Sequence, residues 1–323
     1  MNRTSSPMGD KMRLAVASAA ACLLGLAFAS GLPAKRAQES DPLACQDCHA
    51  ETAATWKNSL HRGYLQRYLG EAAAECSHCH GDASTHLAEP TKDNIRRFSP
   101  KSVEGIRQSA RLCLGCHRTV VNERSWSATA HPSAGISCFD CHRVHGPDDA
   151  YAHLHRKNGG MSKLPAVSGQ ADAPSQIVNA SCIACHEDIA GQLRARSHHP
   201  MLEGRVKCTD CHEVHRSTEP ALLPTGRDVR DVCTDCHTDR RGPFIFEHEP
   251  VHSSGLGEGC ITCHRPHGSP NPKLAPYFGR ALCMQCHTDI LEDGAHRVRP
   301  GNCWRAGCHA AIHGSNRSEV FLE

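Results

Sequence analysis

The arrangement of the cysteines constrains this chain more than any other feature of its sequence. The 323 residues include 21 cysteines, and all except Cys22 form ten pairs, each followed at once by a histidine. Nine pairs have the spacing C-x-x-C-H: Cys45/Cys48/His49, Cys76/Cys79/His80, Cys113/Cys116/His117, Cys138/Cys141/His142, Cys182/Cys185/His186, Cys208/Cys211/His212, Cys233/Cys236/His237, Cys260/Cys263/His264 and Cys283/Cys286/His287. The tenth pair has four intervening residues: Cys303/Cys308/His309.

This grouping is typical of covalent haem attachment. Two thiols must reach the vinyl groups of one haem, and the adjacent imidazole then binds its iron. Paired cysteines can also hold structural zinc or form a disulfide framework, but neither explains a histidine at the same offset in every pair. The sequence therefore predicts ten covalently attached haems c, which use all twenty paired cysteines and the ten motif histidines.

The motifs repeat in units of two. Each unit has a first motif, a histidine 9 to 14 residues later, a second motif and another histidine soon after. Five units occupy about 41–90, 111–150, 179–217, 230–269 and 280–314, within a decahaem domain at 41–314. The non-motif positions predict the distal iron ligands: His61, His86, His131, His145, His199, His215, His248, His267, His296 and His313.

The histidine inventory leaves some choices open. Of the 25 histidines, those outside motifs and distal positions are His78, His153, His155, His198 and His252. The repeat alone does not decide between His198 and His199, or between His248 and His252, and it does not say which distal histidine serves which haem. Methionine is a poor rival because few methionines lie beyond the N-terminal segment: Met161, Met201 and Met284. The sequence thus predicts low-spin, bis-histidine haems of low potential.

The composition predicts an unusual fold. Aromatic residues make up only 4% of the chain, and the apolar patterns of an ordinary core are thin. We expect a multihaem cytochrome c fold: a mostly irregular chain with short α-helices packed around a closely stacked haem array, and little or no β-structure. Candidate helices are 47–57, 181–195 and 280–291. Residues 148–176 are rich in Gly and Pro and predict a linker loop, and 315–323 predict a disordered tail.

The N-terminus predicts export. Arg3, Lys11 and Arg13 precede an apolar run at 14–28, and Ala27-Phe28-Ala29 is a small-x-small cleavage pattern, so 1–29 is predicted to be a signal peptide. The run is shorter than the ~20 residues that a spanning helix needs, and the residues before Cys22 do not form a lipobox. The mature protein is therefore expected in the periplasm. A formal net charge of +2 gives no sign of nucleic-acid binding.

Several segments around the predicted ligands resemble the MtrA/DmsE family of periplasmic decahaem cytochromes. They are Gly242-Pro243, Glu247–Val251, Cys263–Ser269, Ile312–Asn316 and Ser197–Pro200. The similarity extends over nearly all of the mature chain, and it favours His199 and His248 over their neighbours. Two departures are the longer spacing of the tenth motif and the length of the 148–176 loop.

The resemblance implies a location and partners. Members of that family lie in or against a porin-like β-barrel of the outer membrane and carry electrons between the periplasm and the cell exterior. The implied partners are the barrel and a periplasmic electron donor or acceptor, with an outer-surface multihaem cytochrome as a further candidate.

Two other functions compete with this transmembrane route. A soluble periplasmic shuttle feeding a reductase would need the same haems without the barrel. A multihaem enzyme, such as a nitrite- or hydroxylamine-converting one, would need a haem with an open position, often marked by a lysine-bearing motif. All ten motifs here end in histidine, so we expect an electron carrier rather than an enzyme.

Overall fold

The structure, a computed structural model, describes residues 42–98, 102–142, 144–145, 174–251, 258–299, 301–305 and 308–322. All of these lie within one unit defined by internal contacts, Glu39–Glu323. The predicted signal peptide, residues 148–173 of the predicted linker, and His153, His155 and His252 lie outside the described residues.

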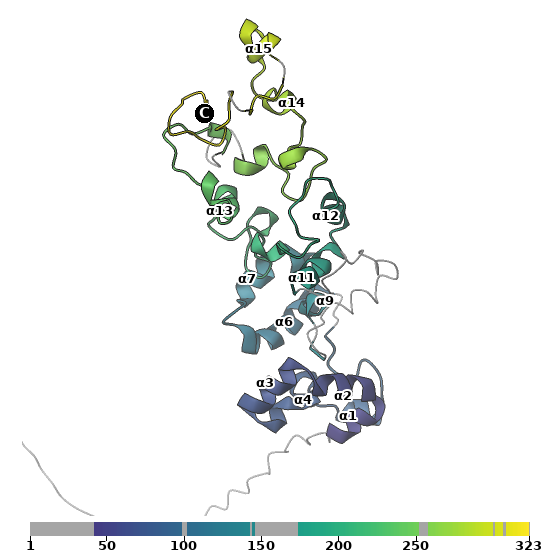
Figure 1. Cartoon of the computed structure of the whole chain (residues 1–323). Helices are drawn as coiled ribbons and strands as arrows, with labels where there is room; N and C mark the ends of the chain where they lie inside the picture. Colours follow the sequence, from purple (N-terminus) through teal and green to yellow (C-terminus); the bar gives the residue numbers. More distant parts are fainter. Residues whose placement is uncertain are drawn as a thin grey trace, which may run out of the picture. The chain divides into compact units, whose positions relative to one another are not determined.

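Short helices joined by irregular segments make up the described chain (Figure 1). In the N-terminal half the helices are α1 (Pro42–Cys48), α2 (Ala50–Lys57), α3 (Leu60–Leu69), η1 (Glu71–Ala74), α4 (Cys76–His80), α5 (Ser84–Ala88), α6 (Val103–His117), α7 (Glu123–Ala128), α8 (Ala130–Ser133) and α9 (Cys138–Cys141). The described residues contain no β-strand, only the isolated bridges Ser197–Ser269 and Phe246–Ser315. The expected fold class, with little or no β-structure, is confirmed.

The described C-terminal half also consists of short helices. They are α11 (Pro174–Ile183), α12 (Glu187–Gln192), η2 (Cys208–Asp210), η3 (Pro220–Leu222), α13 (Val229–Thr234), η4 (Thr238–Arg240), η5 (Glu249–Val251), η6 (Gly259–Thr262), η7 (Pro272–Leu274), α14 (Arg280–Cys283), η8 (Asp289–Leu291) and α15 (Gly294–Val298). None of the helices in the described part of the chain is long and apolar enough to cross a membrane.

The three predicted helices were wrong as continuous elements, because each is interrupted at or near a haem motif. His49 lies between α1 and α2 with φ −114° and ψ 44°, and His186 precedes α12 with φ −90° and ψ 65°. Neither conformation is helical. Residues 280–291 likewise divide into α14 and η8. The backbone therefore leaves the helical conformation at His49 and His186, whereas His80 and His117 are the last residues of α4 and α6.

The longest helix, α6, was not predicted. Ser102 caps it by accepting a hydrogen bond from the Gly105 amide at 3.1 Å. Ile106, Ala110 and Leu114 are spaced at i, i+4 and i+8, and all are buried. The third haem motif lies at the C-terminal end of this helix, where Cys113 is half-buried and Cys116 and His117 are exposed.

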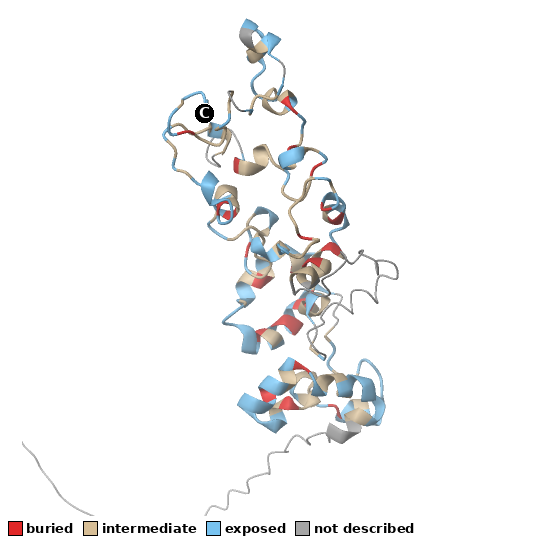
Figure 2. Ribbon diagram, in the orientation of Figure 1, coloured by how far each residue is buried: buried red, intermediate tan, exposed pale blue. Residues whose placement is uncertain are grey.

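Buried apolar side chains are sparse and scattered in the described chain (Figure 2). One cluster contains Ile183, Ala190, Leu193 and Met201. A second is built on the α6 face and includes Trp126. Clusters of this size are too small to form the main core of a chain of this length.

The C-terminal segment corrects a prediction. Residues 315–323 were expected to be a disordered tail, but the Val320 carbonyl accepts a 2.6 Å hydrogen bond from Nδ1 of His309. The Phe321 ring lies 5.3 Å from the His248 ring, measured between centroids. These contacts with two predicted ligands tie residues 320–321 to the rest of the molecule.

Candidate haem-binding sites

The haem motifs share one backbone turn. In eight of them the amide of the motif histidine donates to the carbonyl of the first cysteine at 2.8–3.1 Å: His49, His142, His186, His212, His237, His264, His287 and His309. His309 makes this bond to Cys303 at 2.9 Å despite two extra residues in its motif. The longer spacing is therefore absorbed between the cysteines and leaves the position of the histidine relative to the first cysteine unchanged.

The two cysteines of a motif differ in exposure. All ten first cysteines are half-buried, whereas the second cysteine is exposed in six motifs: Cys48, Cys116, Cys141, Cys185, Cys236 and Cys286. Side chains of a protein core are enclosed by the polypeptide. The predicted attachment cysteines differ from them, because the polypeptide encloses some of these cysteines only in part. Protein alone encloses Cys185 and Cys286 poorly, although the first cysteines of the same motifs, Cys182 and Cys283, are partly covered. An exposed thiol is accessible to the vinyl group that it is predicted to bind, so this difference is compatible with the assignment.

Ten pairs of imidazole rings are the central feature of the structure. Each pair joins one motif histidine to one predicted distal histidine, with ring centroids 5.8–6.4 Å apart: His49–His86, His61–His117, His80–His145, His131–His186, His142–His215, His199–His237, His212–His267, His248–His287, His264–His313 and His296–His309. Every predicted ligand occurs once.

The separation within these pairs fits an iron atom between the two rings. With metal–nitrogen bonds of about 2 Å and a ring centroid roughly 1.2 Å beyond each nitrogen, the centroids of two trans ligands lie about 6.4 Å apart. Rings in direct contact would approach more closely. The donor set, two cysteines and two histidines at each site, therefore fits haem c.

The pairing follows a regular rule across the five units. The distal histidine between the motifs of one unit pairs with the first motif of the next, as His61 does with His117. The second motif pairs with the last histidine of the next unit, as His80 does with His145. Among the ten pairs, those at the two ends of the chain, His49–His86 and His296–His309, remain within one unit. Each unit therefore depends on its neighbour to complete its sites, as in repeat proteins.

The sequence left two candidates at each of two places, and the structure describes both of them at one place, His198 and His199. His199 pairs with His237, whereas the adjacent His198 hydrogen-bonds to the Ala195 carbonyl at 2.6 Å and to Glu203 at 3.1 Å. His248 pairs with His287. His78, another histidine assigned no ligand role, is exposed on α4. The structure therefore brings together the residues that the family resemblance favoured.

Backbone carbonyls hold many of these rings in one tautomer. Nδ1 lies 2.6–3.1 Å from a carbonyl oxygen in seven of them: His80 (Arg96), His86 (Thr91), His199 (Pro266), His212 (Ala221), His248 (Ile312), His264 (Lys273) and His309 (Val320). Because a carbonyl only accepts, Nδ1 must carry the proton. The lone pair of Nε2 is then available to a metal.

Burial keeps several of the paired histidines neutral. It lowers the pKa of His131, His145, His215, His248, His264 and His267. Burial, assisted by the charge of Arg240, lowers the pKa of His313 to about 4. By contrast, the hydrogen bond to Glu203 raises the pKa of the unpaired His198. A lowered pKa favours the neutral imidazole, which is the form that binds iron.

Neighbouring motifs touch through their cysteines, whose free thiols stand for the thioether sulfurs of a haem-bound chain. The first cysteines of consecutive motifs lie close enough together to shift the pKa of at least one thiol in each of the pairs Cys113–Cys138, Cys182–Cys208, Cys233–Cys260 and Cys283–Cys303. Second cysteines interact across the intervening junctions: burial and then the nearby Cys116 raise the pKa of Cys79. Burial and then Cys286 raise the pKa of Cys263 in the same way. The motifs therefore neighbour one another in sequence order.

The junction between the fourth and fifth motifs departs slightly from this alternation. Although the side chain of Cys141 is exposed overall, partial desolvation of its thiol, followed by the nearby Cys182, Asp140 and other thiols, raises its pKa to about 11. Cys185 also lies close enough to Cys141 to contribute to this rise. Both cysteines of the fifth motif therefore lie near the fourth, although the 148–173 segment separates the two motifs along the chain.

Comparisons with known proteins agree with this geometry. A family described as "Doubled CXXCH motif" matches residues 198–242 and 248–291, and one described as "Cytochrome c-type protein NrfB-like" matches residues 76–163. The multiheme cytochrome MtrA of Shewanella baltica (strain OS185) is 28% identical over 289 residues, which cover 84% of this chain and 78% of that protein. The chain is an MtrA-like multihaem c-type cytochrome.

Two more distant relatives match smaller parts of this MtrA-like cytochrome. The high-molecular-weight cytochrome c of Nitratidesulfovibrio vulgaris (strain Hildenborough) is 25% identical over 203 residues, 56% of this chain and 33% of that protein. The cytochrome c-type protein NrfB of Escherichia coli O6:H1 (strain CFT073) is 24% identical over 152 residues, 47% of this chain and 68% of that protein. Together these similarities mark the MtrA-like chain as an electron carrier.

Aromatic side chains beside the ligand rings were missed in the sequence. Trp56 lies edge-on to His145 with centroids 5.9 Å apart, and Trp126 lies 6.3 Å from His215. Each tryptophan stands five residues before a distal histidine, so the repeated W-x-x-x-x-H was the available signal. The indole nitrogen of Trp126 is buried without a hydrogen-bond partner in the described part of the chain. It is therefore a donor suited to a haem propionate.

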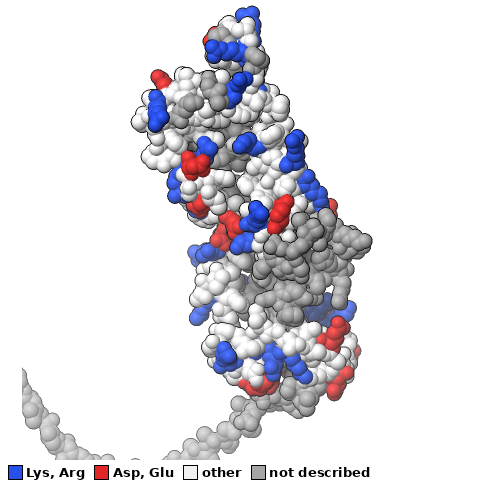
Figure 3. Space-filling model, viewed as in Figure 1, with Lys and Arg blue, Asp and Glu red and all other residues white. Residues whose placement is uncertain are grey.

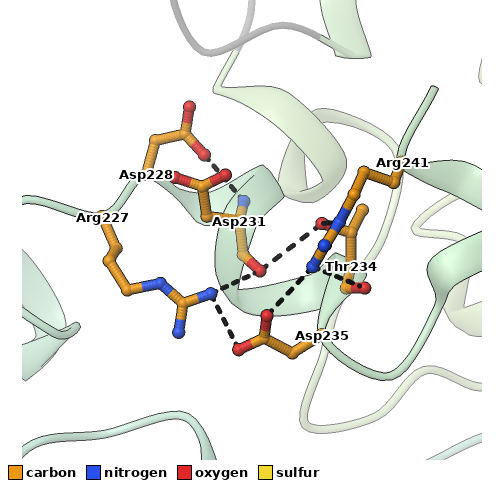
Figure 4. Close-up of polar contacts among 6 residues, drawn as sticks. All are labelled: Arg227, Asp228, Asp231, Thr234, Asp235 and Arg241. Atoms are coloured by element: carbon orange, nitrogen blue, oxygen red, sulfur yellow. Dashed lines mark hydrogen bonds and ion pairs between the residues drawn. The ribbon is translucent and has the colours of Figure 1, made fainter. Parts of the chain in front are cut away.

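A polar network holds the seventh motif of the MtrA-like cytochrome in place (Figure 4). The Asp235 carboxylate joins Arg227 at 2.7 Å to Arg241 at 3.1 Å, and Arg241 also donates to the Thr234 carbonyl at 3.2 Å. Asp228 caps α13 by accepting from the Asp231 amide at 2.8 Å. The network ties the segments before and after Cys233 and Cys236 to the helix that carries the motif.

Charged side chains of both signs are interspersed on the face drawn in Figure 3. The formal net charge of the whole chain is only +2. Since each haem brings two propionates, the haem-bound protein would be more acidic than this sum.

Proposed function

We propose that this cytochrome binds ten haems c and conducts electrons along them. The observation that carries the proposal is the one-to-one pairing of ten motif histidines with ten distal histidines. When bound, each haem supplies a one-electron Fe(III)/Fe(II) couple. Each pair of cysteines would attach one haem through two thioether bonds, and each pair of rings would fill both axial positions of its iron.

The paired histidines of the chain would keep substrates from binding to the iron atoms. With both axial sites occupied by imidazole, a substrate could reach the iron only by displacing a ligand. The carbonyl partners of Nδ1 and the flanking aromatic rings restrict ring rotation, so ligand loss is disfavoured. This arrangement serves outer-sphere electron transfer rather than substrate turnover.

The order of the motifs provides a route. Contacts between first cysteines alternate with interactions between second cysteines from one motif to the next. The units also exchange distal ligands only with neighbouring units. We infer that electrons pass from site to site in sequence order, between the site of His49 at one end and that of His309 at the other.

We further propose that this route crosses the outer membrane. The predicted signal peptide supports a periplasmic location, and the similarity to MtrA over 84% of the chain supports a matching role. Large barrels have polar lumens that can be plugged by protein. The proposed partners are a porin-like β-barrel, a periplasmic electron donor or acceptor, and an outer-surface multihaem cytochrome.

Extraction of outer membranes with a mild detergent tests this placement. The cytochrome is expected to purify as a stable complex with a β-barrel protein, which mass spectrometry of the complex would identify. Recovery of the cytochrome alone from the soluble periplasmic fraction would contradict the transmembrane route. That result would leave the ten-haem assignment intact and favour a periplasmic shuttle that feeds a reductase.

A further inference from the structure

One ligand histidine is held by a charged group rather than by a carbonyl. Nδ1 of His296 lies 2.9 Å from Oδ2 of Asp293, whereas seven other paired histidines direct Nδ1 at the backbone. His296 pairs with His309, whose own Nδ1 lies 2.6 Å from the Val320 carbonyl. The last site of the chain therefore combines one neutral and one anionic acceptor behind its two ligands.

Local structure builds the contact between Asp293 and His296. Asp293 precedes α15, and its carbonyl accepts from the amides of His296 at 3.1 Å and Arg297 at 3.0 Å. The same short turn thus brings the Asp293 side chain to the ring three residues later. From α14, the Arg280 guanidinium donates to the His296 carbonyl at 2.7 Å and to the Arg299 carbonyl at 3.2 Å, which secures the backbone.

A carboxylate behind a ligand imidazole changes the metal that the ligand binds. It draws the Nδ1 proton toward itself and gives the ring imidazolate character, so the ring donates more charge to the metal. Extra donation stabilises Fe(III) relative to Fe(II) and lowers the reduction potential. The side chains of His296 and Asp293 are 38% and 53% exposed, so solvent weakens the effect without abolishing it.

We propose that Asp293 acts through His296 to lower the reduction potential of the haem held by His296 and His309. This inference rests on the proposed function, because it requires both histidines to bind the same iron. Its consequence is that the C-terminal end of the electron route gives up electrons more readily than its ligand type alone would allow.

The test compares two variants of the full-length, haem-loaded protein. Asp293→Asn keeps an acceptor for Nδ1 and removes the charge. Glu292→Gln removes the same charge from the exposed neighbouring residue. A potentiometric titration of the haem absorbance is expected to show about one-tenth of the total shifting to higher potential in D293N and no such shift in E292Q. His296→Met identifies the part of the titration that belongs to this site, because methionine ligation raises the potential.

Three results would overturn the proposal. They are equal titrations of D293N and wild type, equal shifts in D293N and E292Q, and a downward shift in D293N. Electron paramagnetic resonance of D293N should remain low-spin, since a high-spin signal would mean that Asp293 holds the ligand rather than tuning it. Failure of the proposed function would look different, because the wild-type protein would then lack haem or low-spin iron at this site.

Discussion

The adjacent histidines 198 and 199 offer a sharp test of the ligand assignment. They share a backbone environment, yet only His199 faces a motif histidine, with its ring centroid 6.2 Å from that of His237. Substitution of His199 by alanine removes one ring from one of ten pairs. The expected result is that about one-tenth of the haem becomes high-spin, while substitution of His198 by alanine leaves all haem low-spin.

The size of this effect separates ligand loss from unfolding. Besides its ring pair, His199 contributes the hydrogen bond to the Pro266 carbonyl, and a single bond of this kind stabilises a protein by about 1 kcal/mol. The other nine pairs should therefore remain intact in H199A. Integration of the high-spin and low-spin ferric signals by electron paramagnetic resonance measures the fraction directly.

His198 could itself move onto the iron in H199A, so the double variant H198A/H199A serves as the control. The assignment would be refuted if the double variant kept all its haem low-spin. It would also be refuted if H198A alone produced the high-spin signal.

Three further variants test other parts of the structure. In Gly268→Ala the new methyl group would collide with the backbone carbonyl of Gln192 at the end of α12, so thermal unfolding should show that the free energy of unfolding falls by about 1–3 kcal/mol. The control Gly63→Ala, whose methyl group meets nothing within 4 Å, should lose no stability. Equal losses in the two variants would contradict the packing. Asp235→Asn breaks two exposed ion pairs and should cost no more than about 1 kcal/mol, less at high salt; a salt-independent loss would argue against an ionic contribution. Deletion of residues 320–323 removes the carbonyl that holds the His309 ring and should alter the low-spin signal of that site, whereas an unchanged spectrum would make this segment dispensable.

The ligands of this cytochrome could be predicted because covalent haem attachment requires a fixed local pattern of residues. The motif His309 was recognisable despite its longer spacing, and distal residues such as His61 and His313 followed from counting and repetition. The pairing could not be predicted in this way. Whether His80 faces His86 or His145 depends on how one unit lies against the next, and neighbouring units exchange distal ligands in both directions.

The exposure of the attachment cysteines was also beyond the sequence. The spacing C-x-x-C-H treats both thiols of a motif alike, yet Cys185 and Cys286 are exposed while their partners Cys182 and Cys283 are half-buried. The first cysteines of consecutive motifs also interact with one another, as Cys283 does with Cys303. Such contacts form between different motifs, so the sequence of a single motif does not predict them.

The helices were harder to predict than the sites. Helix propensity alone predicts helices that continue through His49 and His186. The backbone leaves the helical region at both residues, where the imidazole must turn toward the metal. The sequence of α6 does contain a helical pattern, because Ile106, Ala110 and Leu114 lie on one face. This pattern was missed beside the haem motifs. Phe321 was predicted to lie in a free tail because its contact, the His248 ring, is distant in sequence.

The number of haems on one chain decides whether each motif histidine and its distal partner form a separate site. Intact mass spectrometry of the purified, mature protein counts them, because thioether-bound haem survives denaturation and adds a fixed increment per site. We expect the mass of the processed chain plus ten haems. A mass corresponding to nine would remove one site, of which the C-x-x-x-x-C-H motif at Cys303 and Cys308 is the first candidate, and any smaller number would contradict the one-to-one assignment of the histidine pairs.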